Sequence, residues 1–222
     1  MKKIFFLSLL VLPFLFSCEK ETEGVSRTTF FAELTLTGPG VVVMPVNSTY
    51  VEPGYVAIEN EVDVSANVQV TGGLNTSEVG AYELTYTVLN ADGFPKTASR
   101  LVLVVPANLS SADLTGTFTG QRTGAAAVPS ACNINKLADG VFFADDLFGG
   151  YYNKVAGYGL AYRLKTYFVL NSDNTIIALW SDSPWGPWEV LNGVYNPTTN
   201  VITHTVKQGT FSFGVTLTKE LE

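Results

Sequence analysis

The loop from Trp180 to Glu189 has the clearest capacity to bind a ligand. It reads Trp-Ser-Asp-Ser-Pro-Trp-Gly-Pro-Trp-Glu and contains all three tryptophans of the chain. Its prolines stiffen it, and a stiff loop loses little entropy when it binds. Indole faces beside carboxylates suit sugar rings, which have an apolar C–H face and a polar rim. We therefore expect Trp185 and Trp188 to bind a glycan. Burial in the core is the alternative, and we favour it for Trp180 at the end of an apolar strand.

Two pairs of residues before this loop are further candidates for the same site. Tyr151 and Tyr152 follow two glycines, and because neighbours in a strand point to opposite faces, at least one of them should be exposed. Asp145 and Asp146 lie between an aromatic strand and the same glycines. Their carboxylates could bind a cation or a sugar hydroxyl, although capping of the turn is the interpretation that we favour.

The chain lacks the residue combinations that common catalytic and metal sites require. Its single histidine, His204, lies in the alternating run from Val201 to Val206, which is typical of a packed or hydrogen-bonded strand residue. One histidine and two cysteines leave little support for a zinc site or a Ser-His-Asp triad. We expect no enzyme, no cofactor and no metal. A glycosidase that uses Asp145 or Asp182 is a distant alternative, and calcium at an interdomain edge lacks the usual Asp-x-Asp ladder.

The first residues of the chain form a leader that ends at a cysteine. Two lysines precede a 13-residue apolar run, Ile4–Phe16, which is shorter than the roughly 18 residues that span a bilayer as a helix. The run closes with Ser17-Cys18, and this pattern resembles a bacterial lipoprotein signal. The resemblance implies that residues 1–17 are removed and that acyl chains on Cys18 anchor the protein to a lipid bilayer. An ordinary secretory leader is the alternative, and Cys132 is expected in the core.

Residues 18–26 continue as a charged tether. The run from Glu19 to Gly24 is similar to the acidic export signals of surface lipoproteins in gut-type Gram-negative bacteria, while a solvated linker explains it equally well. The resemblance places the protein at the outer membrane, exposed at the cell surface. Loss of the two leader lysines changes the formal net charge from −7 to −9, which argues against nucleic acid as a partner.

From residue 30 onward, short alternating runs of β-branched and aromatic residues end in clusters of Gly, Pro, Asn or Asp. This pattern predicts an all-β protein without amphipathic helices. In the segment 27–106, Tyr82–Val88 and Thr97–Val105 flank a turn sequence at 90–93, which predicts a hairpin. Residues 106–113 break the pattern and predict a boundary before a second domain at 112–222.

The first of these segments resembles a bacterial Ig-like repeat domain. Pro53-Gly54 precedes a Val-rich strand, the motif Gly-x-Tyr-x-Leu-x-Tyr follows from Gly80 to Tyr86, and Arg100 lies in the last strand. The resemblance implies a β-sandwich that serves as a spacer or adhesive module without catalysis.

The second segment holds 16 of the 27 aromatic residues. Its short loops favour antiparallel neighbours, so about eight strands are expected in a sandwich or barrel. The clearest runs are 114–120, 140–144, 166–170, 175–180, 189–195, 201–206 and 210–219. The motifs Gly-Thr-Phe-x-Gly, Gly-Val-Phe-x-x-Asp-Asp and Gly-Gly-Tyr-Tyr resemble a C-terminal domain of unknown function. That domain follows an Ig-like module in surface lipoproteins encoded beside carbohydrate-uptake (Sus-like) systems.

These patterns together predict an Ig-like β-sandwich followed by an antiparallel β-sandwich or barrel-like domain. We expect a non-catalytic surface lipoprotein that is anchored through Cys18 and binds a glycan through its second domain. The alternative is a structural or accessory subunit that docks a partner outer-membrane transport protein and has no ligand of its own.

Overall fold

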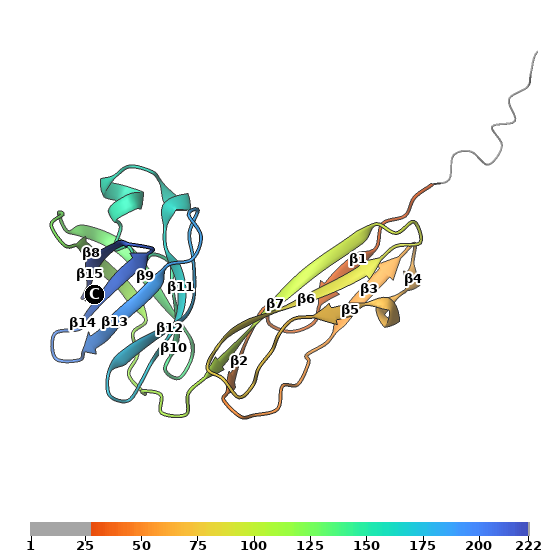
Figure 1. Cartoon of the computed structure of the whole chain (residues 1–222), viewed down its shortest axis with the longest axis horizontal. Coiled ribbons are helices and arrows are strands. Elements are labelled where there is room, and N and C mark those ends of the chain that lie inside the picture. The colour runs from red at the N-terminus through yellow and green to blue at the C-terminus, as the bar shows by residue number, and fades with distance from the viewer. Residues whose placement is uncertain (1–27, 222) are drawn as a thin grey trace, which may run out of the picture.

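The computed structural model describes residues 28–221 as two β domains connected by an extended segment (Figure 1). Strands dominate both domains, which confirms the all-β prediction. Cys18 and the tether 18–26 lie outside the described residues. No described helix is long and apolar enough to cross a membrane. Helical structure in this part of the chain is limited to short turns, namely η1 (Ser65–Asn67), η2 (Tyr151–Val155) and η3 (Leu160–Tyr162).

The first domain contains β1 (Glu33–Leu36), β2 (Val41–Pro45), β3 (Tyr55–Glu59), β4 (Val62–Asp63), β5 (Gln69–Thr71), β6 (Gly80–Leu89) and β7 (Pro95–Val105). One sheet has the order β1-β3-β4, and the other has the order β2-β7-β6-β5, in which β2 runs parallel to β7. Side chains from both sheets, such as Leu34, Ala57 and Tyr86, share one core. This arrangement confirms the predicted Ig-like sandwich.

The predicted hairpin joins β6 and β7, which pair along their whole length. The Oδ1 atom of Asn90 accepts the N–H of Asp92 at 3.1 Å and the N–H of Phe94 at 2.7 Å. Gly93 has a φ of 85°, which a residue without a Cβ adopts at little cost. The turn residues and the alternating residues of the two flanking strands therefore both favour this hairpin.

Arg100 in β7 is fully buried in the first domain. Its guanidinium donates to the carboxylate of Glu52 and to the carbonyl oxygens of Thr37 at 2.5 Å and Pro39 at 3.2 Å. The Tyr86 hydroxyl donates to the same carboxylate. Burial raises the pKa of Glu52, but hydrogen bonds, with that from Tyr86 the largest, outweigh burial and leave the pKa below its ordinary value. The arginine and tyrosine of the Ig-like motif thus connect loops that are far apart in sequence.

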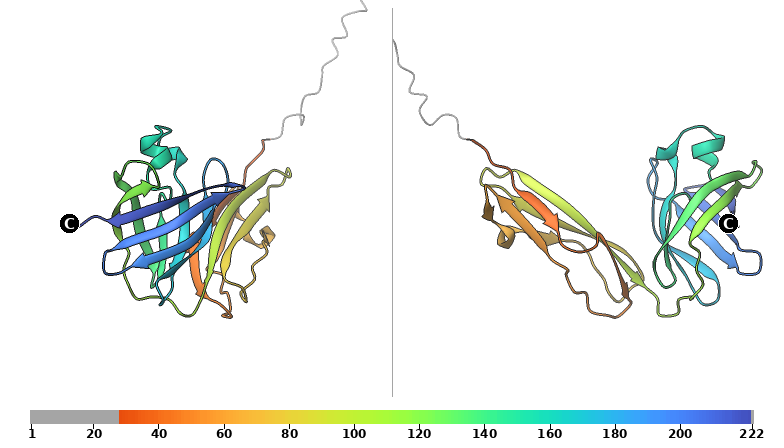
Figure 2. Two further views of the ribbon diagram at one scale, coloured as in Figure 1. Left: turned by 60° about the vertical axis from the view of Figure 1, so that its left-hand side comes forward. Right: turned by 180° about the vertical axis from the view of Figure 1, so that it is seen from behind.

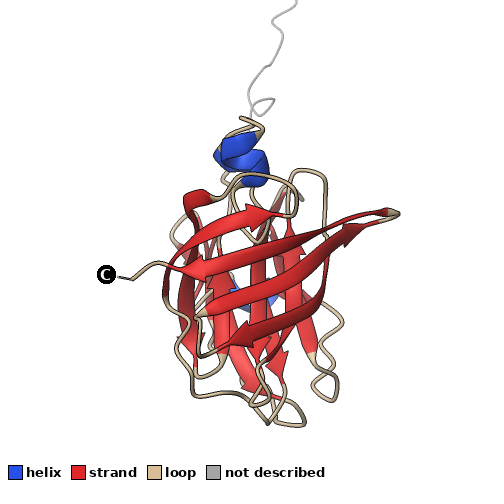
Figure 3. Cartoon of the chain, turned by 90° about the vertical axis from the view of Figure 1, so that its left-hand side faces the viewer, coloured by secondary structure: helices blue, strands red, loops and turns tan. Residues whose placement is uncertain are grey.

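The second domain is a closed barrel of eight antiparallel strands (Figure 3). Around the barrel the order is β10-β11-β12-β13-β14-β15-β8-β9. The structure thus confirms the expected strand number and antiparallel pairing, and it shows a barrel rather than a sandwich. The strands are β8 (Gly116–Arg122), β9 (Val128–Ala138), β10 (Val141–Ala144), β11 (Lys165–Leu170), β12 (Thr175–Asp182), β13 (Glu189–Asn196), β14 (Val201–Gln208) and β15 (Phe211–Lys219).

Aromatic and aliphatic side chains fill the barrel, and Phe118 and Phe142 are fully buried there. His204 is also buried, and its Nε2 lies 2.8 Å from the carbonyl oxygen of Leu147. This contact confirms the prediction of a packed, hydrogen-bonded strand histidine. Cys132 is fully buried in the same core, as expected.

The two domains are connected at one end of each (Figure 2). Beside this connection they share an apolar cluster. Val105 at the end of β7 belongs to the same buried cluster as Val141 of β10 and Val169 of β11. The connecting segment follows the barrel, because the N–H of Ser110 donates to the carbonyl oxygen of Leu170 at 2.9 Å. The barrel end that carries η2 and η3 lies away from this connection (Figure 1).

Candidate functional site

The turns η2 and η3 cover one end of the barrel (Figure 3). Between β10 and η2 the chain reverses at Gly149 and Gly150, whose φ angles of 64° and 75° lie in the left-handed region. A Cβ at Gly149 would lie 2.9 Å from Cγ1 of Val215, so only glycine permits this close approach to β15. The expectation that Tyr151 and Tyr152 lie in a strand is therefore wrong, because this reversal places them in a helical turn.

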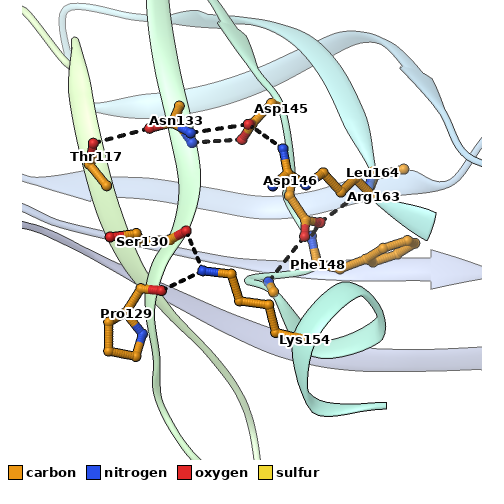
Figure 4. A network of polar contacts seen from close by, with 11 residues as sticks. Thr117, Pro129, Ser130, Asn133, Asp145, Asp146, Phe148, Lys154, Arg163 and Leu164 are labelled. Carbon is orange, nitrogen blue, oxygen red and sulfur yellow. Dashed lines mark hydrogen bonds and ion pairs between the residues drawn. The ribbon is translucent and has the colours of Figure 1, made fainter. Parts of the chain in front are cut away.

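Asp146 stabilises the reversal from inside the protein (Figure 4). Its carboxylate accepts the backbone N–H groups of Phe148 at 3.0 Å, Gly150 at 3.2 Å and Leu164 at 3.2 Å. Burial raises the pKa of Asp146 to about 7, although the hydrogen bonds from Leu164 and Phe148 lower it. The side chain is fully buried. It therefore caps the turn and has no oxygen available to a ligand in solution.

Asp145 is also used within the protein (Figure 4). Its Oδ2 lies 2.7 Å from Nη1 of Arg163, and its Oδ1 accepts the N–H of Asn133 at 2.6 Å. Both partners of the ion pair are largely buried. Across residues 28–221, no three side chains of His, Cys, Asp or Glu gather in a way that could hold a metal ion. Asp146 thus caps the turn, which is the role that we favoured for this pair, whereas Asp145 instead pairs with Arg163.

Trp185 is the most exposed of the three tryptophans, with 39% of its surface accessible. It projects from the loop between β12 and β13, and hydrogen bonds hold this loop in place. Ser183 Oγ donates to the carbonyl oxygen of Gly186 at 2.9 Å. Gln208 Nε2 donates to the carbonyl oxygens of Trp185 at 2.8 Å and Pro187 at 3.1 Å. A rigid loop thus presents an indole to solvent.

Three tyrosines lie against this indole, and a fourth lies against one of the three. The ring centroid of Trp185 lies 4.8 Å from that of Tyr152, 5.0 Å from that of Tyr162 and 6.2 Å from that of Tyr158. Tyr151 lies 5.1 Å from Tyr152, ring to ring. All five residues are exposed or half-buried. We call this group, which consists of Tyr151, Tyr152, Tyr158, Tyr162 and Trp185, the aromatic cap.

Sequence reasoning selected three members of the aromatic cap and missed Tyr158 and Tyr162. These two rings approach Trp185 only because η2 and η3 lie beside each other over the barrel end. The available signal was the density of tyrosines between residues 151 and 162. Without knowledge of the chain reversal at Gly149 and Gly150, the sequence did not indicate that these tyrosines lie beside Trp185.

The other two tryptophans lie outside the aromatic cap. Trp188 is 6% exposed and packs in the barrel core, with its ring centroid 4.9 Å from that of Phe148. Trp180 is half-buried on the outside of the barrel, 5.5 Å from the ring of Tyr167. The expectation that Trp180 lies in the core is therefore wrong. A shift in the register between β11 and β12, next to Tyr167, separates the ring from the inward-facing residues.

Family models match both domains of the chain. Residues 34–104 match the bacterial surface protein Ig-like domain, and residues 108–219 match a family model that is described as a C-terminal domain. No curated protein matches the sequence.

Solved structures that are similar to this chain include the following two. The lipoprotein BT2262 from Bacteroides thetaiotaomicron is 32% identical, with 85% of this chain and 100% of that chain covered and a TM-score of 0.47. A Clostridium perfringens ZmpB structure of CBM51-2 in complex with GlcNAc and INT domains is 12% identical. The match covers 85% of this chain and 43% of that chain, with a TM-score of 0.32. The predicted resemblance to lipoproteins with these two domains is confirmed, whereas the link to Sus-like systems stays a prediction. Because the C-terminal model spans half of the sequence, the chain belongs to the family that this domain defines, here with a bacterial surface Ig-like domain before it.

Proposed function

We propose that this protein is a lipid-anchored surface protein that binds a glycan through its aromatic cap. The observation that carries the proposal is Trp185, which is 39% exposed on a rigid loop and surrounded by tyrosine rings. Leaving a large apolar ring in water forgoes roughly 1.5–3 kcal/mol of burial. A ligand that covers the indole recovers this free energy, and the rigid loop keeps the entropic cost small.

A sugar ring fits the chemistry of the aromatic cap. Its apolar C–H face can stack on Trp185, while tyrosine hydroxyls at the edge of the patch can exchange hydrogen bonds with its hydroxyl groups. The exposed Tyr158 and the half-buried Tyr152 and Tyr162 all lie within 6.2 Å of the indole, ring centroid to ring centroid. The patch is therefore wider than a single ring and suits an oligosaccharide.

Cys18 supplies the membrane anchor in this proposal, and residues 18–26 supply the tether. The resemblance of the leader to lipoprotein signals and the similarity to a lipoprotein of Bacteroides thetaiotaomicron support the anchor. The described part of the chain begins at the end of the first domain that is far from the barrel (Figure 1). The Ig-like domain would then act as a spacer that holds the aromatic cap away from an outer membrane.

A glycan array followed by calorimetric titration of the purified full chain tests the proposal. We expect Trp185→Ala to weaken binding about 10- to 100-fold, the loss that corresponds to about 1.5–3 kcal/mol. Trp180→Ala is the matched control, because it removes an indole outside the aromatic cap and should leave the affinity unchanged. Equal binding by wild type and Trp185→Ala, or loss only in the control, would contradict the proposal. A transport protein that co-purifies from outer membranes, without any affinity for sugars, would instead favour the accessory subunit.

A further inference from the structure

Arg122 ends β8 beside the aromatic cap and is held there by aromatic rings. Its guanidinium carbon lies 4.2 Å from the ring centroid of Tyr151 and 4.3 Å from that of Phe213. The ring of Phe211 is 5.6 Å away. Arginine planes stack well on aromatic rings, because the electron-rich face of a ring attracts a weakly hydrated cation. These contacts restrict the side chain before any ligand arrives.

The polar edge of this guanidinium is unused. Within residues 28–221, the guanidinium of Arg122 has no hydrogen bond and no ion pair, and the side chain is half-buried. Other cations of the chain do have carboxylate partners, as in the pairs Arg100–Glu52, Lys136–Asp139, Arg163–Asp145 and Lys207–Glu189. A guanidinium carries five N–H donors in a planar fork that matches a carboxylate or a sulfate. Arg122 therefore offers a positioned anion-binding group.

The neighbouring cation Lys154 does not offer the same group. It lies on η2, the turn that also carries Tyr151, but its Nζ donates to the carbonyl oxygens of Pro129 and Ser130 at 2.8 Å each (Figure 4). Through these hydrogen bonds the ammonium group holds η2 against β9. The anion-binding capacity at this side of the aromatic cap thus rests on Arg122.

We propose that the glycan bound by the aromatic cap is acidic and that Arg122 binds its negatively charged group. The inference rests on the proposed function, because it names the ligand class of the same site. From Trp185 the rings continue to Tyr152 at 4.8 Å and from Tyr152 to Tyr151 at 5.1 Å, and Tyr151 contacts Arg122. Each step is comparable to the length of one sugar unit. A sugar stacked on Trp185 and an acidic group at Arg122 therefore belong to different units of one oligosaccharide.

The acidic group is a carboxylate of a uronic acid or a sulfate ester, since both present the oxygens that a guanidinium binds in pairs. Matched pairs of oligosaccharide probes distinguish a carboxylate from a sulfate ester. In oligogalacturonate and its methyl ester the carboxyl group is charged in one and uncharged in the other, and sulfated carrageenan oligosaccharides differ from their desulfated, uncharged forms in the sulfate. Titration of the purified full chain with each pair measures what the charge contributes.

We expect the acidic member of at least one pair to bind about 10- to 100-fold more tightly than its neutral counterpart, as a charge-assisted double hydrogen bond would give. Arg122→Gln should remove this preference without reducing the affinity for the neutral member. Arg122→Lys keeps the charge but lacks the planar fork, so it should restore only part of the preference. Lys136→Gln removes the same charge from the same barrel away from the aromatic cap and should change nothing. Thermal unfolding of each variant reports whether the barrel remains folded.

The possible failures are distinguishable. Equal affinity for acidic and neutral probes, with binding that still depends on Trp185, overturns the role of Arg122 and leaves the proposed function intact. A preference for acidic probes that persists in both Arg122 variants also overturns the inference. Absence of binding to all four probes overturns the inference, whereas the proposed function falls only if the glycan array also finds no ligand.

Discussion

Trp185 and Trp188 are three residues apart in one loop, yet Trp185 is 39% exposed and Trp188 is 6% exposed. The first indole lies against the tyrosines of the aromatic cap, and the second lies against Phe148 inside the barrel. Both indoles follow a proline in the sequence, but the fold of the loop gives one a place at the surface and the other a place in the core. Trp188 attaches the loop to the core, and this attachment holds Trp185 in the aromatic cap.

Truncation of the two indoles should separate these roles. Trp188→Ala removes a buried ring from the barrel core, so we expect the free energy of unfolding to fall by about 3–5 kcal/mol. Trp185→Ala removes a partly exposed ring, so the loss should stay below about 1.5 kcal/mol. Urea unfolding followed by circular dichroism measures both. Equal losses in the two variants would show that the indole of Trp185 contributes to the core after all.

The strands from β11 to β15 were predictable because each has a local signal at both ends. Alternating residues form the strand, and turn residues such as Asp173 and Asn200 end it. β9 lacked such a signal. Pro129 and Ser130 interrupt its start, and Ser130 adopts a φ of 48°, so the alternation is not visible in sequence.

The arrangement of the aromatic cap was not predictable, because the interactions that build it are distant in sequence. Asp146 accepts the N–H of Leu164, 18 residues later, and this bond fixes the segment between β10 and β11. The approach of Gly149 to Val215 spans a still longer separation. Candidate residues such as Trp185 follow from composition and loop chemistry, whereas the neighbours of Trp185 follow from tertiary structure.

Asp146→Asn should destabilise the barrel and change its dependence on pH. The amide places an N–H₂ group where a carboxylate oxygen accepts backbone N–H bonds, which should cost about 1–3 kcal/mol. Burial raises the pKa of Asp146 from 3.8 to about 7, so the folded state binds this proton more tightly than the unfolded chain. Its contribution to stability is therefore complete below about pH 4 and is lost as the pH rises to about 7.

Unfolding free energies of wild type and Asp146→Asn between pH 4 and 7 measure this contribution. Wild type should lose at most about 4 kcal/mol over this range. The deficit of Asp146→Asn should therefore shrink as the pH rises and vanish or reverse near pH 7. A difference that grows with pH would show that the N–H donors of Phe148 and Leu164 outweigh burial and keep the carboxylate charged.

His204→Gln should reveal a pH dependence of the opposite sign. Burial lowers the pKa of His204 from 6.5 to about 4, against the hydrogen bond with Leu147, so the folded state holds the ring neutral. The stability from this residue is present above about pH 6.5 and is lost as the pH falls toward 4. Glutamine cannot titrate, so the variant should lose less stability than wild type on acidification. Parallel pH profiles for the two proteins would contradict a buried, neutral imidazole.

Arg100→Gln should destabilise the first domain and affect the barrel much less. The substitution leaves Glu52 and the Tyr86 hydroxyl without their central partner. Because Arg100 is fully buried but Glu52 is 31% exposed, the cost should lie at or below the roughly 3–5 kcal/mol of a fully buried ion pair. Lys96→Gln removes the same charge from an exposed position on the same strand and serves as the control.

Two spectroscopic signals can locate the effect of Arg100→Gln, because all three tryptophans lie in the barrel. Tryptophan fluorescence reports the unfolding of the barrel, while circular dichroism reports the strands of both domains. We expect the midpoint from circular dichroism to fall and the fluorescence midpoint to move less. The apolar cluster of Val105, Val141 and Val169 connects the domains, so a partial shift of the fluorescence midpoint measures their coupling. Identical shifts in both signals would instead show that the two domains unfold as one cooperative unit.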